Sequence, residues 1–227
     1  MFELFAAGTL LLLAGLAWAT YQSGRLLRSI PIHENLLLAP VENAVKALLV
    51  VICAGLGLLS GLRPAALGWT SAAPARDLAL GLVAGLAVQG VVNAATLWAI
   101  WRFGKQIYSP IVLLNVLPRR RREWLLVPAA MFPAVLLEEL LFRSLALGGF
   151  GAVVPPWLLV LPLAALFGWM HAPQGALGMI VAAAVSAILS ALFLATGSLL
   201  APLIAHYLIN LLQLVRAREV EHWLHEY

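Results

Sequence analysis

Residues 135–145 read VLLEELLFRSL, and they place two adjacent glutamates and an arginine inside an otherwise apolar stretch. That stretch, residues 123–147, exceeds the roughly 20 residues that a helix needs to cross a bilayer. An ionised side chain at the centre of a bilayer costs about 2.5 to 3.5 kcal/mol on an insertion scale. Three of them within six residues therefore require compensating partners or a function.

The composition of the whole chain is that of a membrane protein. Of its 227 residues, 63% are hydrophobic and 11% are charged, whereas soluble domains carry about 25% charged residues. We therefore expect an all-α integral membrane protein with about seven transmembrane helices, and eight helices are the alternative. The seven apolar stretches are residues 2–22, 41–62, 78–101, 123–147, 155–172, 175–195 and 198–216.

An eighth apolar stretch, residues 107–117 (IYSPIVLLNVL), is shorter than the others. It has only eleven residues and contains Pro110. A stretch of that length is typical of an interfacial or re-entrant segment rather than of a membrane span.

Basic residues predict the orientation of the helices. With seven helices and the N-terminus outside, ten Lys and Arg residues fall in inner loops and the tail, and only Arg63 and Arg76 fall outside. This bias follows the positive-inside rule. The run RRRR at 119–122 fits an anchor at anionic lipid and does not indicate nucleic-acid binding. The absence of an organelle-targeting segment favours a prokaryotic inner membrane.

The spacing of the charged residues indicates which glutamate is structural. Glu139 and Arg143 are four residues apart with the acid first, the favourable order for an ion pair on one helix face. Glu138 lies about 100° further round the helix. We therefore expect Glu139 to be held by Arg143 and the lone pairs of Glu138 to be uncommitted.

Two other pairs of residues share a helix face because they are four residues apart: Phe167 with His171, and His206 with Asn210. From the predicted outer turns, Glu138 and His171 lie roughly 15 and 22 Å deep, and His206 and Asn210 roughly 12 and 18 Å deep. All four polar residues are therefore expected near one level of the membrane, where they can face one another.

Such a cluster is suited to hydrolysis. Glu138 would act as a general base on water with help from His171, while His206 and Asn210 would donate hydrogen bonds to an oxyanion. A zinc site formed by Glu138, His171 and His206 is an alternative, although no HExxH motif is present. A proton relay in a transporter and a structural role in helix packing are further alternatives.

The motifs EELLFR (138–143), FGWMH (167–171) and HYLIN (206–210) resemble EExxxR, FxxxH and HxxxN of the CAAX protease and bacteriocin-processing family, the CPBP or ABI intramembrane proteases. The resemblance covers about residues 123–216. It implies an intramembrane endopeptidase similar to the Ras-converting enzyme, in which Glu138 and His171 activate water and His206 and Asn210 form the oxyanion site. Glu139, Arg143 and Phe167 would support them.

The resemblance also divides the chain. Residues 1–122 would form an N-terminal transmembrane region of three helices and an interfacial segment. Residues 123–216 would form a catalytic core of four helices, and 217–227 an amphipathic tail with Val220, Trp223, Leu224 and Tyr227 on one stripe. No cofactor is expected unless the zinc alternative holds. The expected partners are the lipid bilayer and a membrane-embedded or lipidated substrate, and the non-enzymatic alternative is an immunity or scaffold protein.

Overall fold

The computed structural model describes residues 1–29 and 35–221, and within these ranges every regular element is a helix. The long helices are α1 (Phe2–Ser29), α2 (Pro40–Leu59), α3 (Pro74–Phe103), α5 (Glu123–Glu139), α6 (Pro156–Met170), α7 (Gly175–Thr196) and α8 (Leu200–Glu219). The short helical pieces are η1 (Leu36–Leu38), η2 (Lys105–Ile107), α4 (Ile111–Val116), η3 (Leu140–Gly149) and η4 (Ala172–Gln174).

All seven apolar stretches form helices, and six helical segments in the described ranges are long and apolar enough to cross a membrane. The chain is therefore an all-α, multi-pass membrane protein, as expected. The exception is α6, which corresponds to the predicted span 155–172 but has only 15 residues, or about 22 Å at 1.5 Å per residue. The segment 107–117 contains only the six-residue α4, which is too short to cross a bilayer.

Several helices are longer than their apolar stretches, because a helix continues into the interface where polar residues are hydrated. The first continues from residue 22 to Ser29, and the last from residue 216 to Glu219. The first three residues of the predicted tail, 217–219, are thus part of α8. The stripe through Trp223, Leu224 and Tyr227 lies outside the described residues.

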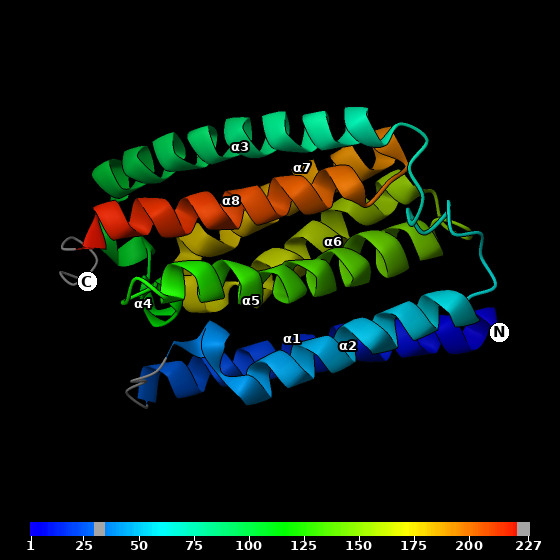
Figure 1. Ribbon diagram of the computed structural model, residues 1–227, viewed down its shortest axis with the longest axis horizontal. Coiled ribbons are helices and arrows are strands. Elements are labelled where there is room, and N and C mark those ends of the chain that lie inside the picture. The colour runs from blue at the N-terminus through cyan, green and yellow to red at the C-terminus, as the bar shows by residue number, and fades with distance from the viewer. Residues whose placement is uncertain (30–34, 222–227) are drawn as a thin grey trace.

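Small residues bring α3 and α8 into close contact. A Cβ atom at Gly81 would lie 2.7 Å from the Ala201 carbonyl oxygen, and one at Gly85 would lie 3.1 Å from the Ala205 carbonyl oxygen. This is the small-xxx-small pattern that lets helix backbones approach in membranes. Figure 1 shows the two helices side by side along much of their lengths. The N-terminal region is thus packed directly against the predicted core.

The helix that carries the two glutamates changes its winding directly after them. Residues Glu123–Glu139 are α-helical, and Leu140–Gly149 continue the same rod as a π-helix. π-Helical turns are rare and occur frequently at functional sites. The segment 123–147 is therefore not one regular α-helix, and the change of winding alters the directions of the side chains that follow Glu139.

The connection between α2 and α3 folds into one end of the bundle. Leu67 is 1% exposed, and the Gly68 carbonyl accepts a hydrogen bond from the Leu199 N–H at 2.8 Å. The Trp69 indole N–H donates to Ser144 Oγ at 2.7 Å. This loop therefore connects the N-terminal region to both the π-helix and the start of α8.

Basic residues gather at the opposite end of the bundle. The last turns of α3 and α8 carry Arg102, Arg216 and Arg218, and the run 119–122 immediately precedes α5. Figure 1 shows these helix ends together, near α4 and the C-terminal label. This arrangement agrees with the predicted grouping of positive charge, while the orientation across a membrane stays a prediction.

Candidate active site

A buried ion pair lies at the junction of the α-helix and the π-helix. Arg143 Nη1 donates to Glu139 Oε1 at 3.0 Å, and both side chains are fully buried. Arg143 Nη2 also donates to the carbonyl oxygen and to Oγ of Ser186 on α7, each at 3.0 Å. The expected pairing of Glu139 with Arg143 is therefore confirmed. Ser186 extends the network to α7, and it lies 43 residues after Arg143 in the sequence.

His206 on α8 lies between the two adjacent glutamates. Its Nδ1 is 2.7 Å from Glu139 Oε1, and its Nε2 is 3.5 Å from Glu138 Oε2. Glu138, whose lone pairs were expected to be uncommitted, therefore has His206 as an ion-pair neighbour. The reason is tertiary, because two carboxylates about 100° apart on one helix can both be reached from opposite sides of a single imidazole ring.

The two glutamates differ in their access to solvent. The Glu138 side chain is 36% exposed, whereas Glu139 is 0% exposed. Because Glu139 is enclosed and Glu139 Oε1 already accepts from Arg143 and His206, it has little capacity to exchange protons with a substrate. Glu138 is the more accessible of the two bases, and its carboxylate lies at the edge of the buried network.

Phe167 connects the second histidine to this network. Its ring lies 4.6 Å from the His171 ring and 6.0 Å from the His206 ring, centroid to centroid. The Arg143 guanidinium lies 5.3 Å from the same ring centroid, within the range of a cation–π contact. Phe167 therefore contacts the rings of both histidines.

His171 is oriented by its own helix end. It caps α6, and its Nδ1 lies 2.7 Å from the Phe167 carbonyl oxygen. Since a carbonyl only accepts, Nδ1 carries the proton of that hydrogen bond, and in the neutral ring Nε2 is the free base. The half-buried ring is thus held in one tautomer by a backbone group.

Asn210 lies one turn after His206 on α8 and is half-buried. Its amide has no hydrogen bond to any of the residues that the structure describes. The contacts thus unite six of the seven predicted site residues. Asn210 is related to them only by its helical spacing from His206.

Some residues around the cluster were not singled out from the sequence. Ser186 and Ser144 are both hydrogen-bonded, to Arg143 and Trp69 respectively. No local signal distinguishes such serines, because their partners are at least 43 residues away. The position of Ser144 directly after Arg143 was the nearest available indication.

The ligands of the zinc alternative are not arranged around a common point. Among the described residues, no group of three His, Cys, Asp or Glu side chains is placed to hold a metal ion. In this arrangement Glu138, His171 and His206 do not fit a zinc site.

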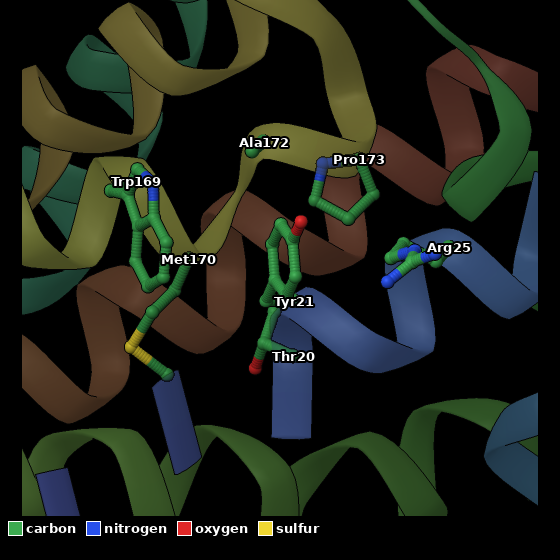
Figure 2. Close-up of a pocket in the computed structure, with 8 residues that line it drawn as sticks. Thr20, Tyr21, Arg25, Trp169, Met170, Ala172 and Pro173 are labelled. Atoms are coloured by element: carbon green, nitrogen blue, oxygen red, sulfur yellow. The ribbon is translucent and has the colours of Figure 1, made fainter. Parts of the chain in front are cut away.

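A small cavity of about 110 Å³ borders the turn that holds His171. It lies between the end of α1 and the segment from Trp169 to Pro173 (Figure 2). Tyr21 stacks on Trp169 with ring centroids 6.3 Å apart, and Figure 2 shows Tyr21 between Trp169 and Arg25. A Cβ atom at Gly24 would lie 2.7 Å from Pro173 Cγ. The first helix therefore supports the His171 turn at close range.

Apolar helices around a buried cluster of acids, histidines and an arginine define a multi-pass membrane protein with a polar site inside its helix bundle. Residues 120–212 match the model of the family described as type II CAAX prenyl endopeptidase Rce1-like. This segment contains all three motifs, and its match to the family model confirms the resemblance and indicates a peptidase of the CAAX type. Comparisons with curated proteins and with solved structures found no match.

Proposed function

We propose that the protein is a glutamate-type intramembrane endopeptidase in which Glu138 is the general base. The observation that carries the proposal is the half-exposed Glu138 carboxylate, 3.5 Å from His206 Nε2 and next to a fully buried Glu139. The family match supports the reaction class. A carboxylate that can be reached by water and flanked by an imidazole is suited to accept a proton during attack on a carbonyl.

His171 assists Glu138 in this proposal. Its Nδ1 proton is held by the Phe167 carbonyl, so its Nε2 is available to accept and later return a proton. Glu138 and His171 would together hold the attacking water and transfer its proton to the leaving amine. The reaction consumes one water and breaks one peptide bond, with the proton passing from water to the new amino group.

His206 and Asn210 stabilise the oxyanion that develops on the attacked carbonyl. His206 Nδ1 faces Glu139, so its Nε2 is the atom directed to the reacting groups. Donation from Nε2 requires a proton on both ring nitrogens, and the two carboxylates supply the negative neighbours for that charged form. The Asn210 amide, one turn away, supplies a second donor.

The substrate in this proposal is a peptide near the terminus of a membrane-anchored or lipidated protein. The site lies within a bundle of apolar helices, so a substrate that reaches it from the bilayer is favoured over a soluble one. We further propose that this membrane is a prokaryotic inner membrane. No metal takes part in the proposed reaction.

The test compares membrane-protein termini by mass spectrometry in cells that carry wild type or Glu138→Gln at equal abundance. The proposal expects a defined set of new termini in wild type that is absent in Glu138→Gln. Glu42→Gln is the matched control, because Glu42 pairs with Lys46 on the surface of α2. Termini that persist in a folded Glu138→Gln protein would exclude the proposed base and favour the immunity or scaffold alternative.

A further inference from the structure

A larger cavity, of about 790 Å³, lies among α3, α7 and α8 at the basic end of the bundle. Cavities that bind ligands usually have volumes of about 300 to 1,000 Å³ with mostly apolar walls and a few polar groups. This cavity fits that description, since its surface is largely apolar. The neutral hydrogen-bonding side chains in its lining include Gln89, Asn93, Thr96, Gln174 and Gln213.

The deepest polar pair in this lining has unused hydrogen-bonding capacity. Gln89 is 3% exposed, and its Nε2 donates to Asn93 Oδ1 at 2.8 Å. Gln89 Oε1 is buried and accepts no hydrogen bond from the described residues, and Asn93 Nδ2 donates none. A buried polar atom without a partner is costly. The pair lines the cavity and therefore has, at its wall, one acceptor and one donor without a partner among the described residues.

A peptide unit complements this pair. It offers an N–H to Gln89 Oε1 and a C=O to Asn93 Nδ2, whereas a hydrocarbon chain offers neither. The remaining amides, Gln174 and Gln213, again combine donors with acceptors. The cavity is thus better matched to a polypeptide backbone than to the acyl chains of a lipid.

Two of the lining residues are close in sequence to candidate active-site residues. Gln213 is seven residues after His206 and three after Asn210, so all three lie on one face of α8. Gln174 ends the 3-10 turn that follows His171, and its N–H donates to the His171 carbonyl at 2.9 Å. A chain that leaves the cavity along α8 therefore passes towards the candidate catalytic residues.

The mouth of the cavity lies beside an aromatic surface. Trp98, Trp101 and Phe103 are 58%, 80% and 52% exposed near the end of α3, and Trp101 lines the cavity. Exposed aromatic residues at helix ends are typical of the level where a membrane meets water. The occupant is therefore expected to be held at the membrane and to enter the cavity from there.

We propose that this cavity binds the backbone of the membrane-anchored substrate and directs it to Glu138. The inference rests on the proposed function and extends it, because it assigns substrate recognition to α3, which lies outside the segment that matches the protease family. Gln89 and Asn93 are binding residues in this proposal, and they take no part in the chemical step.

The first test replaces Gln89 and Asn93 by leucine in the full-length chain and measures the Glu138-dependent termini. Leucine approximates the volume and is compatible with an apolar helix, so the fold is expected to survive. Loss of hydrogen bonds from two buried amides is expected to lower the yield of these termini about tenfold at equal protein abundance. Gln106→Leu is the control, because Gln106 is exposed and contacts the Phe103 carbonyl outside the cavity.

Gln213→Leu provides a second variant on a different helix, and it is expected to lower the same termini. Unchanged termini in both the Gln213 variant and the double variant would overturn the inference while leaving the protease intact. Absence of any Glu138-dependent terminus in wild type would instead refute the proposed function and the inference with it. The two failures are thereby distinguished.

The second test places a photo-crosslinking amino acid at Leu97, which lines the cavity and is 50% exposed. The experiment uses the Glu138→Gln chain in its native membrane, so that uncleaved substrate accumulates. Adducts are expected to contain segments of the same proteins that lose their new termini in Glu138→Gln, and Gln89→Leu is expected to reduce them about tenfold. Adducts with phospholipid alone, or only with proteins that lack such termini, would overturn the inference.

Discussion

Replacing Arg143 by methionine is expected to destabilise the protein by about 3 to 5 kcal/mol, because removal of one partner from a buried ion pair leaves the other charge uncompensated. Arg143 and Glu139 are both fully buried, and they are joined at 3.0 Å. Methionine preserves most of the chain length, so the loss reports the charge and its hydrogen bonds rather than a cavity. The change is measured as the unfolding free energy in mixed micelles, with tryptophan fluorescence as the signal.

Two further variants separate the contributions to this network. Ser186→Ala removes one of the two acceptors that Ser186 offers to Arg143, and its carbonyl still accepts at 3.0 Å. It is expected to cost about 1 kcal/mol. Adding Glu139→Gln to Arg143→Met removes the unpaired carboxylate while an amide oxygen still faces His206, so the double variant is expected to recover about 1 to 3 kcal/mol.

This series also contains the result that would refute the reasoning. If Arg143→Met lies within about 1 kcal/mol of wild type, the guanidinium does not compensate a buried charge. If the double variant is as unstable as the sum of the two single variants, Glu139 and Arg143 are not coupled, despite their geometry. If Ser186→Ala and Arg143→Met lowered the unfolding free energy equally, the packing of α7, and not the ion pair, would account for the loss.

Three other predictions follow from contacts away from the glutamates. Trp69→Phe and Ser144→Ala are each expected to lower the unfolding free energy by about 1 kcal/mol, and their combination by less than the sum, since they share one 2.7 Å hydrogen bond. Gly81→Val is expected to lower the unfolding free energy by well over 1 kcal/mol, because its Cβ would lie 2.7 Å from the Ala201 carbonyl oxygen. Gly55→Ala, which has open space around the new Cβ, is expected to change the unfolding free energy by less than about 1 kcal/mol. Purified protein with full activity is expected to contain no stoichiometric zinc by elemental analysis and to keep its activity in the presence of chelators. Loss of activity in parallel with loss of the metal would contradict this prediction.

Much of the fold could be predicted because its signals are local. A run of about 20 apolar residues is sufficient to indicate a spanning helix, and each predicted stretch became a helix. The pairing of Glu139 with Arg143 was equally accessible, because residues four apart on a helix are neighbours wherever the helix packs. The shortness of α6 was not predicted, since the predicted span 155–172 included His171 and Ala172, which lie in the turn after the helix.

The parts that escaped prediction depend on contacts between distant segments. Glu139 and His206 are 67 residues apart, and nothing in either motif shows that one imidazole reaches both carboxylates. The π-helix after Glu139 also has no sequence signature in this stretch. The packing of α3 on α8 did have a signal, the paired small residues Gly81 and Gly85, but its partner helix could not be identified from spacing alone.

In the proposed mechanism, two adjacent glutamates are useful where one would not be sufficient. The carboxylate that positions His206 must be enclosed and continuously hydrogen-bonded, as Glu139 is through Arg143 and His206. A base that accepts a proton from water must keep lone pairs accessible, as the 36% exposed Glu138 does. These requirements conflict within a single side chain, but neighbouring helix positions point about 100° apart. One carboxylate can then hold the imidazole from the buried side while the other reaches the opposite nitrogen from the open side.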